Sequence, residues 1–331
     1  MNRNDAQLDR RDCLKWMGAS GLAAAGLPAQ AQDAWPSKPI RWIVPFAPGG
    51  TSSIVARSIA AELTKQMGAN FVIDNKGGGG GVPAMQEMLR SPADGYTIIM
   101  SHIGLMVVNP LIYPDAGYDV NKDFTPVTLL NRIPSLFCVH KDVPVTDLKS
   151  FIAYAKSKPG QLNYASAGNA SAGHLAVEAL KLRSGIFMTH IPYRGTGPAL
   201  TDVLAGRIEF FSAGTPALLP HIKSGALRCL AVGSAQRIAV LPDVPSVSEL
   251  FPGFETVQWY GIHARAGTPP AIITRLQQEC AKALRAPDVV AKHEAESAVP
   301  GGGPPKEYAD FVAKEQARWK EVVIKANIKP G

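Results

Sequence analysis

The sequence is poor in cysteine, and its few thiols are spaced neither as metal ligands nor as pairs. It holds 4 cysteines, of which Cys138, Cys229 and Cys280 follow the N-terminal 31 residues. An odd number of separated cysteines excludes a disulfide framework or a zinc site and predicts buried thiols. The 7 histidines show no HxxxH or HExxH spacing, and the acidic residues form no DxDxD pattern. We therefore expect no bound metal and no cofactor.

Charge is also scarce, and long apolar runs are missing. Charged residues make up 18% and hydrophobic residues 46%, which excludes a disordered chain or a coiled coil. The net charge of +7 is scattered and is not interleaved with aromatic residues, so no nucleic-acid partner is expected. No run after the N-terminal segment reaches the length of a membrane helix. The length of 331 residues instead predicts a globular protein of two domains.

The first 31 residues predict an export signal that is not part of the fold. Residues 10–15 (RRDCLK) precede an apolar, glycine-rich stretch, and we expect cleavage after Ala31. The paired arginines resemble a twin-arginine signal, although Cys13 stands where that pattern usually has Phe. An ordinary secretory signal is the alternative.

Residues 40–67 contain the local pattern around which the rest of the chain is organised. Residues 40–46 predict a strand, residues 48–50 (PGG) a turn, and the apolar residues that recur every four positions from Val55 to Met67 a helix. Thr51, Ser52 and Ser53 then lie at the start of this helix. Hydroxyls and unpaired N–H groups at a helix start, beyond the carboxyl end of a parallel strand, form an anion-binding place.

The later sequence repeats this alternation and predicts an α/β fold with parallel strands. Strands are expected at residues 70–74, 96–100, 124–130, 136–139, 162–165, 188–193, 208–211, 227–232 and 256–264, with helices between most of them. The polar break at residues 131–134 predicts a first crossing between domains, and a second is expected near residues 258–261. Two long helices then return to the first domain.

Two glycine-containing segments admit more than one interpretation. Residues 77–81 (GGGGG) match the GxGxxG/A dinucleotide pattern only weakly, and they form either a nest of N–H groups near a ligand or an exposed turn. Residues 169–174 (NASAGH) approach the nucleophile elbow of a hydrolase, but Asn169 replaces its first glycine. An α/β hydrolase or cofactor enzyme that uses Ser171 and the glycine loop is therefore the rival function. Arg194, at a strand end, either pairs with an anion or is solvated.

The favoured interpretation of residues 166–171 is a helix cap that faces a cleft. The side chains of Ser166, Asn169 and Ser171 would cap the next helix, and its N–H groups would receive a carboxylate. Capping without ligand binding is the alternative.

A series of segments resembles a known family across residues 35–329. They include PIRWIVPFAPGGTSSIVAR, SPADGYTIIM, KPGQLNYASAG, HIPYRGTGPALTDVLAGRIEF and LPDVPSVSEL. Together they are similar to the Bug-type periplasmic solute receptors of tripartite tricarboxylate transporters. The resemblance implies a two-domain periplasmic-binding-protein type II fold that closes on a small carboxylate, and the two crossings described above would form its hinge. The expected ligand is a dicarboxylate or an aromatic carboxylate, for reasons given below. It implies domain 1 at residues 35–132 and 257–331, domain 2 at 133–256, a monomer in the periplasm, and a membrane permease as partner.

The resemblance also assigns the ligand-binding loops by position. The first-domain side is residues 46 and 48–53 with 101–104, the second-domain side is 166–171 and 174, and residues 195 and 212–215 lie nearby. The assigned residues are Phe46, Pro48, Gly49, Gly50, Thr51, Ser52, Ser53, Ser101, Gly104, Ser166, Ala167, Gly168, Asn169, Ala170, Ser171, His174, Gly195 and Ala213.

Four positions depart from the family pattern. Ser53 and Ala213 stand where the family often has Asp, and Ile103 and Leu105 stand where it has small hydroxyl residues. Together with Phe46, the two aliphatic residues predict an apolar wall in the first domain. We therefore expect a carboxylate with an apolar body, such as an aromatic dicarboxylate.

Overall fold

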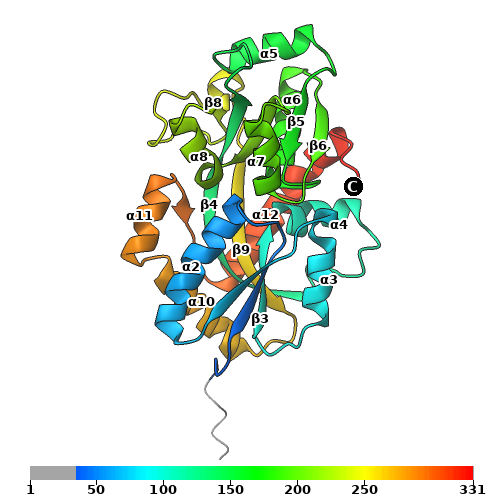
Figure 1. The fold of residues 1–331 in the computed structure, drawn as a ribbon. Coiled ribbons are helices and arrows are strands. Elements are labelled where there is room, and N and C mark those ends of the chain that lie inside the picture. Colours follow the sequence, from blue (N-terminus) through cyan, green and yellow to red (C-terminus); the bar gives the residue numbers. More distant parts are fainter. Residues whose placement is uncertain (1–34, 331) are drawn as a thin grey trace, which may run out of the picture. The chain divides into compact units, whose positions relative to one another are not determined.

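The computed structural model describes residues 35–330, of which residues 38–330 belong to one structural unit. The expected signal at residues 1–31 lies outside the described part of the chain. Eight strands of this unit form a single path of hydrogen-bonded neighbours, two further strands pair beside that path, and helices lie on both sides (Figure 1). The predicted α/β class is confirmed.

The N-terminal strands form what we call the lower sheet, after its place in Figure 1. β1 (Ile40–Val44) pairs in parallel with β2 (Phe71–Asn75) on one side and β3 (Thr97–His102) on the other. α2 (Thr51–Met67) and α3 (Val82–Arg90) connect these strands. The predicted order of strand, helix, strand, helix and strand is confirmed.

The first connecting helix follows its sequence pattern. The side chains of Val55, Ile59 and Leu63 are at most 4% exposed and form the inner face of α2. Gly68 ends the helix at φ 66°, a left-handed conformation that glycine adopts without strain. The helix start is thereby held at the carboxyl end of β1.

β4 (Phe124–His140) and β9 (Val257–Arg265) run through the middle of the unit (Figure 1). β9 is antiparallel to β3 on one side and to β4 on the other. The predicted break at residues 131–134 is wrong, because these residues pair with residues 257–260 and β4 is continuous. One of the two register irregularities in this pairing lies next to Pro126, where the missing N–H of a proline interrupts the ladder.

The end of β4 belongs to a second group of strands, the upper sheet. Residues 135–140 of β4 pair antiparallel with β7 and β8, and β5 pairs in parallel with β6 and β7. The strands are β5 (Asn163–Ser166), β6 (Thr189–Pro192), β7 (Phe210–Gly214) and β8 (Leu227–Val232). Their helices are α5 (Leu148–Ser157), α6 (Ala172–Ser184), α7 (Thr196–Leu204) and α8 (Thr215–Lys223).

The remaining elements are short turns and C-terminal helices. A 3-10 turn (Gly79–Gly81), a π-helical turn (Gly104–Val108), α4 (Asn109–Ile112), α9 (Val247–Leu250) and β10 (Val299–Pro300) lie within loops. α10 (Pro270–Ala283) and α12 (Pro305–Lys325) were expected, whereas α9 and α11 (Pro287–Ala295) were not. α10 packs on α2, and α12 packs on β4, so both return to the lower sheet as predicted.

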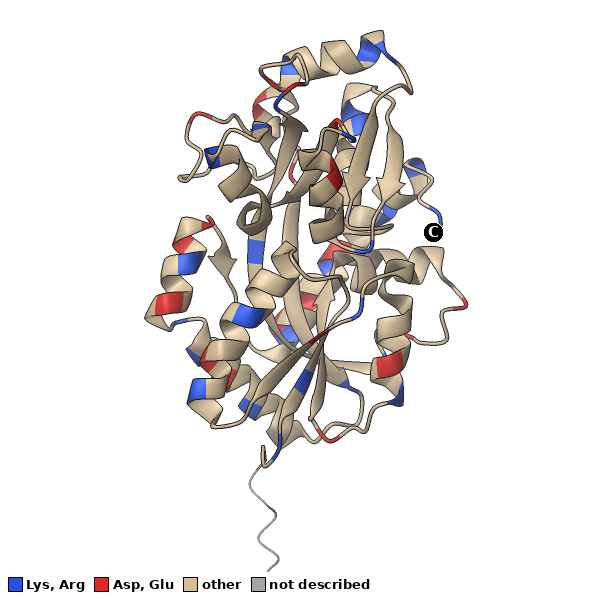
Figure 2. Ribbon diagram, in the orientation of Figure 1, with Lys and Arg blue, Asp and Glu red and all other residues tan. Residues whose placement is uncertain are grey.

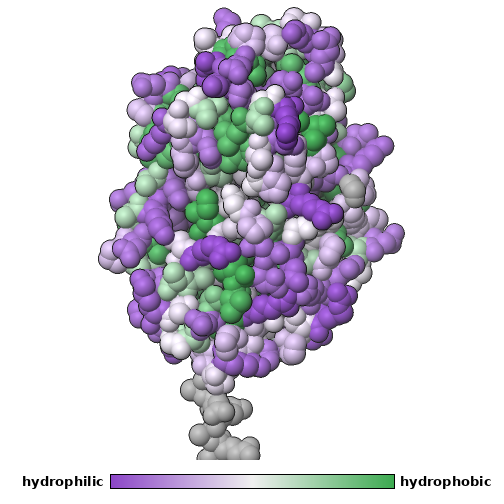
Figure 3. Space-filling model, in the orientation of Figure 1, coloured by the Kyte–Doolittle hydropathy of each residue, from purple (hydrophilic) through white to green (hydrophobic). Residues whose placement is uncertain are grey.

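The surface and the thiols agree with the composition. Lys and Arg alternate with Asp and Glu over the helices, and the face in Figure 3 shows only small hydrophobic patches (Figures 2 and 3). Within residues 35–330 no helix is long and apolar enough to cross a membrane. Of the three predicted buried thiols, Cys138 and Cys280 are buried and Cys229 is half-buried, and burial raises the pKa of Cys138 and Cys280.

Candidate functional site

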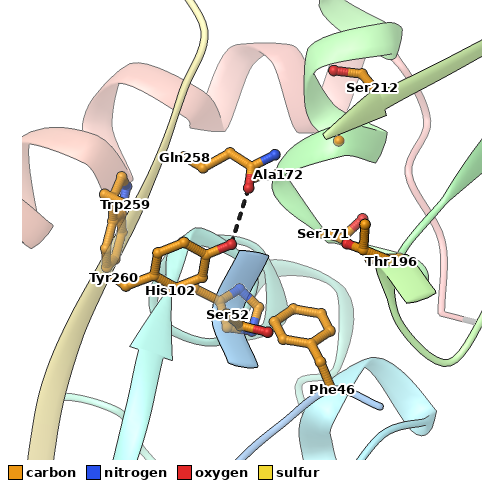
Figure 4. A pocket seen from close by; sticks show the side chains of 12 residues that line it. Phe46, Ser52, His102, Ser171, Ala172, Thr196, Ser212, Gln258, Trp259 and Tyr260 are labelled. Carbon is orange, nitrogen blue, oxygen red and sulfur yellow. Dashed lines mark hydrogen bonds between the residues drawn. The ribbon is translucent and has the colours of Figure 1, made fainter. Parts of the chain in front are cut away.

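A small cavity lies where the loops at the carboxyl ends of several strands meet (Figure 4). Its volume is about 20 Å³, which is room for about one water molecule. The lining comes from the β1–α2 loop, the end of β3, the starts of α2, α6 and α7, and strands β7 and β9. The lining residues are Phe46, Ser52, His102, Ala167, Ser171, Ala172, Gly173, Thr196, Ser212, Gln258, Trp259 and Tyr260.

Three helices, α2, α6 and α7, begin at this cavity, α8 begins beside α2, and the backbone approaches closely at each of these starts. A methyl group added at Gly50, before α2, would lie 2.7 Å from Cβ of Thr196, the first residue of α7. A methyl group at Gly214, before α8, would lie 2.9 Å from Cγ2 of Thr51 in α2. In α6, a methyl group at Gly173 would lie 2.2 Å from the carbonyl oxygen of Ser212. Only glycine permits these approaches.

The electrostatics of the cavity favour an anion without using a charged side chain. None of the 12 residues drawn in Figure 4 is Asp, Glu, Lys or Arg. Each helix start carries a partial positive charge on its free N–H groups, and the lining adds the hydroxyls of Ser52, Ser171, Thr196 and Ser212. Such an arrangement binds carboxylate or phosphate oxygens through neutral dipoles.

β9 contributes an amide donor to the lining. The hydroxyl of Tyr260 donates a hydrogen bond to Oε1 of Gln258 at 2.9 Å (Figure 4). Burial raises the pKa of Tyr260, so this hydroxyl keeps its proton. This bond orients the amide of Gln258, whose nitrogen is a hydrogen-bond donor.

The loop before α6 is fixed from behind by a histidine. Oγ of Ser171 accepts a hydrogen bond from the backbone N–H of His174 at 3.3 Å and caps the helix. Ala170 has a φ of 62°, and its N–H donates to Nδ1 of His174 at 3.2 Å. The His174 ring stacks on His190 at 4.0 Å, and burial lowers the pKa of both histidines to about 3. Both rings are therefore neutral supports for the loop.

This geometry does not form a hydrolase nucleophile. In a serine–histidine pair the ring nitrogen accepts the serine proton. Here Ser171 contacts the backbone of His174, and Nδ1 of that ring already accepts from Ala170. Within residues 35–330 no group of three or more His, Cys, Asp or Glu side chains could hold a metal ion.

The residues assigned from the sequence divide into three groups. Phe46, Ser52, Ala167 and Ser171 line the small cavity. Gly168 and Asn169, with Phe46 and Ala167 again, line an adjoining cavity of about 170 Å³ whose wall also holds residues 78–81 and Arg194. The others surround these cavities without lining them, and their contact with a ligand stays a prediction: Pro48, Gly49, Gly50, Thr51, Ser53, Ser101, Gly104, Ser166, Ala170, His174, Gly195 and Ala213.

Several of these surrounding residues have internal partners. Oγ of Ser53 accepts a hydrogen bond from Nδ2 of Asn75 at 2.8 Å. Oγ of Ser101 lies 2.7 Å from the hydroxyl of Tyr308 and 2.8 Å from Nδ1 of His263. These bonds hold α2 on β2, and β3 on β9 and α12.

The predicted apolar wall is wrong in two of its three residues. Ile103 and Leu105 are 1% and 0% exposed, belong to the hydrophobic core, and line neither cavity. The turn at Gly104 directs them inward, and of the three predicted residues only Phe46 lines a cavity. Sequence reasoning missed Thr196, Gln258 and Tyr260 as lining residues, because no local motif distinguishes them.

Comparison with known proteins identifies the family. Residues 55–328 match the model of the tripartite tricarboxylate transporter family receptor, TctC. The chain is 35% identical over 311 residues to protein BugT of Bordetella pertussis, covering 93% of this chain and 95% of BugT.

Two solved structures superimpose over nearly the whole unit. Rpa4515 of R. palustris, determined with adipate, is 38% identical with a TM-score of 0.86, covering 90% of this chain and 100% of that one. MatC from Rhodopseudomonas palustris, determined with bound malate, is 32% identical with a TM-score of 0.82, covering 87% and 100%. These matches confirm the resemblance noted in the sequence and give no support to the hydrolase alternative. The chain therefore belongs to the tripartite tricarboxylate transporter family of solute receptors.

Proposed function

We propose that this protein is the extracytoplasmic receptor for a small carboxylate, either a dicarboxylate or an aromatic carboxylate. The observation that carries this proposal is the convergence of three helix starts, those of α2, α6 and α7, on one cavity with neutral hydrogen-bond donors. Carboxylates are the anions found in the similar proteins, adipate in Rpa4515 and malate in MatC. The start of α6 would hold one carboxylate through the N–H groups of Ala172 and Gly173 and the hydroxyls of Ser171 and Ser212.

The cavity volume supports a receptor that opens and closes. About 20 Å³ is too small for any dicarboxylate, so a ligand enters only if the loops around the cavity move apart. We propose that domain 1 (residues 35–132 and 257–331) and domain 2 (residues 133–256) separate for entry and close on the ligand. The two crossings, in β4 and β9, are the backbone positions at which such a motion would bend.

The cellular setting follows from the family and the N-terminal sequence. We propose a periplasmic location after export by the twin-arginine route. The closed, loaded receptor would then deliver its ligand to a permease of the tripartite tricarboxylate type and return as a monomer.

Calorimetry on the mature protein tests the proposed function. We expect one-to-one binding of a straight-chain or aromatic dicarboxylate, recovered unchanged after release. At about a hundred times its Kd, such a ligand raises the free energy of unfolding by about 2.7 kcal/mol, which a thermal-shift screen detects. Turnover of a bound acid or ester, or no response to any carboxylate, would contradict the proposal.

A further inference from the structure

His102 occupies the junction between the two cavities. It is the last residue of β3, its side chain is 4% exposed, and it lines both the small and the larger cavity. The Phe46 ring lies beside it, with ring centroids 4.6 Å apart (Figure 4). His102 therefore faces the two cavities from the lower sheet, whereas the proposed carboxylate site at the start of α6 belongs to the upper sheet.

The hydrogen bonding of His102 determines which ring nitrogen carries the proton. The backbone N–H of Gly104 donates to Nδ1 at 3.0 Å, so Nδ1 is an acceptor. Burial lowers the pKa of His102 to about 3, and the ring is neutral at any physiological pH. A neutral imidazole that accepts at Nδ1 must carry its proton at Nε2.

The donor at Nε2 is buried and unused. Nε2 of His102 has no hydrogen-bond partner within residues 35–330. Buried polar groups in folded proteins almost always have a partner, so such a donor at a cavity wall indicates a place for an external acceptor. Oγ of Ser212, across the same cavity, is also buried without a partner.

The ring is held so that this donor cannot turn away. A methyl group at Gly104 would lie 2.6 Å from Cε1 of His102 and 2.6 Å from the carbonyl oxygen of Ala170. The ring is thus confined between Gly104 and Phe46, with Nδ1 already bonded. The donor is fixed before a ligand arrives, which lowers the entropy cost of binding.

We propose that His102 donates its Nε2 hydrogen to a second oxygen-bearing group of the ligand, so that the receptor selects acids that are polar at both ends. This inference rests on the proposed function, because the first carboxylate is taken to occupy the start of α6. A ligand seated there reaches the junction formed by Phe46, His102 and Ala167, where the larger cavity begins. A monoacid with an apolar tail would leave the His102 donor buried without a partner.

Two substitutions separate ligand binding from support of the loop. His102→Asn keeps an amide oxygen near the place of Nδ1, for the Gly104 N–H, and has no group at the place of Nε2. His102→Gln places an amide nitrogen near Nε2 and loses the Nδ1 acceptor. The probes are adipate and hexanoate, which share a chain length and differ by one carboxylate. Calorimetry gives each Kd, and a thermal melt checks that both variants fold.

The expected result is selective. His102→Asn weakens adipate binding by about 10- to 150-fold, the range for a hydrogen bond to a charged group, and leaves hexanoate binding unchanged. For His102→Gln we expect a Kd for adipate within about threefold of the parental value, because the amide nitrogen replaces the Nε2 donor.

Three results would overturn the inference. Unchanged adipate binding in His102→Asn means that the donor is not used. Loss in His102→Gln but not in His102→Asn means that the ring only anchors Gly104. Equal losses for adipate and hexanoate place His102 at the first carboxylate. If the parent binds neither acid nor any other carboxylate, the proposed function fails together with this inference. The other three results overturn this inference alone and leave the proposed function intact.

Discussion

The backbone N–H of Ala47 donates a hydrogen bond to the carbonyl oxygen of Arg194 at 2.9 Å. Ala47 follows β1 and Arg194 follows β6, so this bond joins the lower sheet to the upper sheet at the rim of the cavities. Beside it, a methyl group at Gly197 would lie 2.3 Å from the carbonyl oxygen of Pro48. The two sides of the cleft therefore meet through main-chain atoms.

Gly77→Ala tests whether this contact belongs to the ligand-binding form. The new methyl group would lie 2.3 Å from the carbonyl oxygen of Arg194 and 2.6 Å from the nitrogen of Ala47. It would hold the two loops apart and break their hydrogen bond, so we expect a Kd about tenfold higher by calorimetry.

Gly225→Ala is the matched control for the methyl group added in Gly77→Ala. Gly225 has a φ of 75° and no atom within 4 Å of an added methyl group, so its substitution strains the backbone far from the cleft. It should lower the melting temperature and leave the Kd unchanged. A Gly77→Ala variant with parental affinity would mean that the Ala47–Arg194 contact plays no part in closure.

Ser171→Ala tests the proposed carboxylate site at the start of α6. The substitution removes the helix cap and one hydroxyl of the lining. We expect a Kd about 10- to 150-fold higher, with a loss of about 1 kcal/mol in the free energy of unfolding. Asp147→Ala removes the cap of α5, which does not line the cavity, and should reproduce the loss of stability alone. If both variants bind as the parent does, Ser171 is only a cap.

The buried histidines predict lower stability in acid. Burial lowers the pKa of His102, His174, His190 and His263 to about 3, whereas an unfolded histidine titrates near 6.5. Between these values the unfolded chain binds protons that the folded chain does not, so the free energy of unfolding falls as the pH falls.

One acidic group acts in the opposite direction. Burial raises the pKa of Glu296 to about 7, which favours the folded state as the pH falls from that value toward the ordinary one. Four histidines outweigh this single carboxyl group. Urea unfolding at about pH 7 and about pH 5 should therefore give the lower stability at the lower pH, and equal or higher stability there would contradict the sign worked out from these groups.

Replacing both Arg10 and Arg11 by Lys tests the export route. The twin-arginine route reads guanidinium groups, which Lys lacks, so the precursor should accumulate in the cytoplasm. Cell fractionation with detection of the precursor and mature forms gives the answer. Processing at the parental rate would show that an ordinary secretory signal is sufficient.

Helices and strands with a regular local pattern were predictable from the sequence. The four-residue spacing of Val55, Ile59 and Leu63 fixes the buried face of α2, and Asp147 at the start of α5 forms a capping box with Ser150. The continuity of β4 was not predictable. Residues 131–134 have the composition of a turn, and their pairing with β9 and, for Asn131 and Arg132, with β10, both more than a hundred positions along the chain, holds them extended.

The site was predictable in its loops and less so in its side chains. The start of α6 and Phe46 could be assigned because helix caps and strand ends are local features. The directions of Ile103 and Leu105 depend on a π-helical turn, and that of His102 depends on the register between β3 and β9. Neither leaves a periodic signal in a short segment.

Contact between the two sheets and lining of the cavity are made by different groups, main-chain atoms in the first case and side chains in the second. Gly50, Gly77 and Gly197 meet the opposite side through backbone atoms or first-turn residues that make no choice among ligands. Side chains such as Phe46, His102 and Gln258 line the cavity and can be exchanged one at a time without disturbing those contacts. Substitution in the lining is thus a route to a changed ligand preference that leaves the main-chain contacts between the two sheets in place.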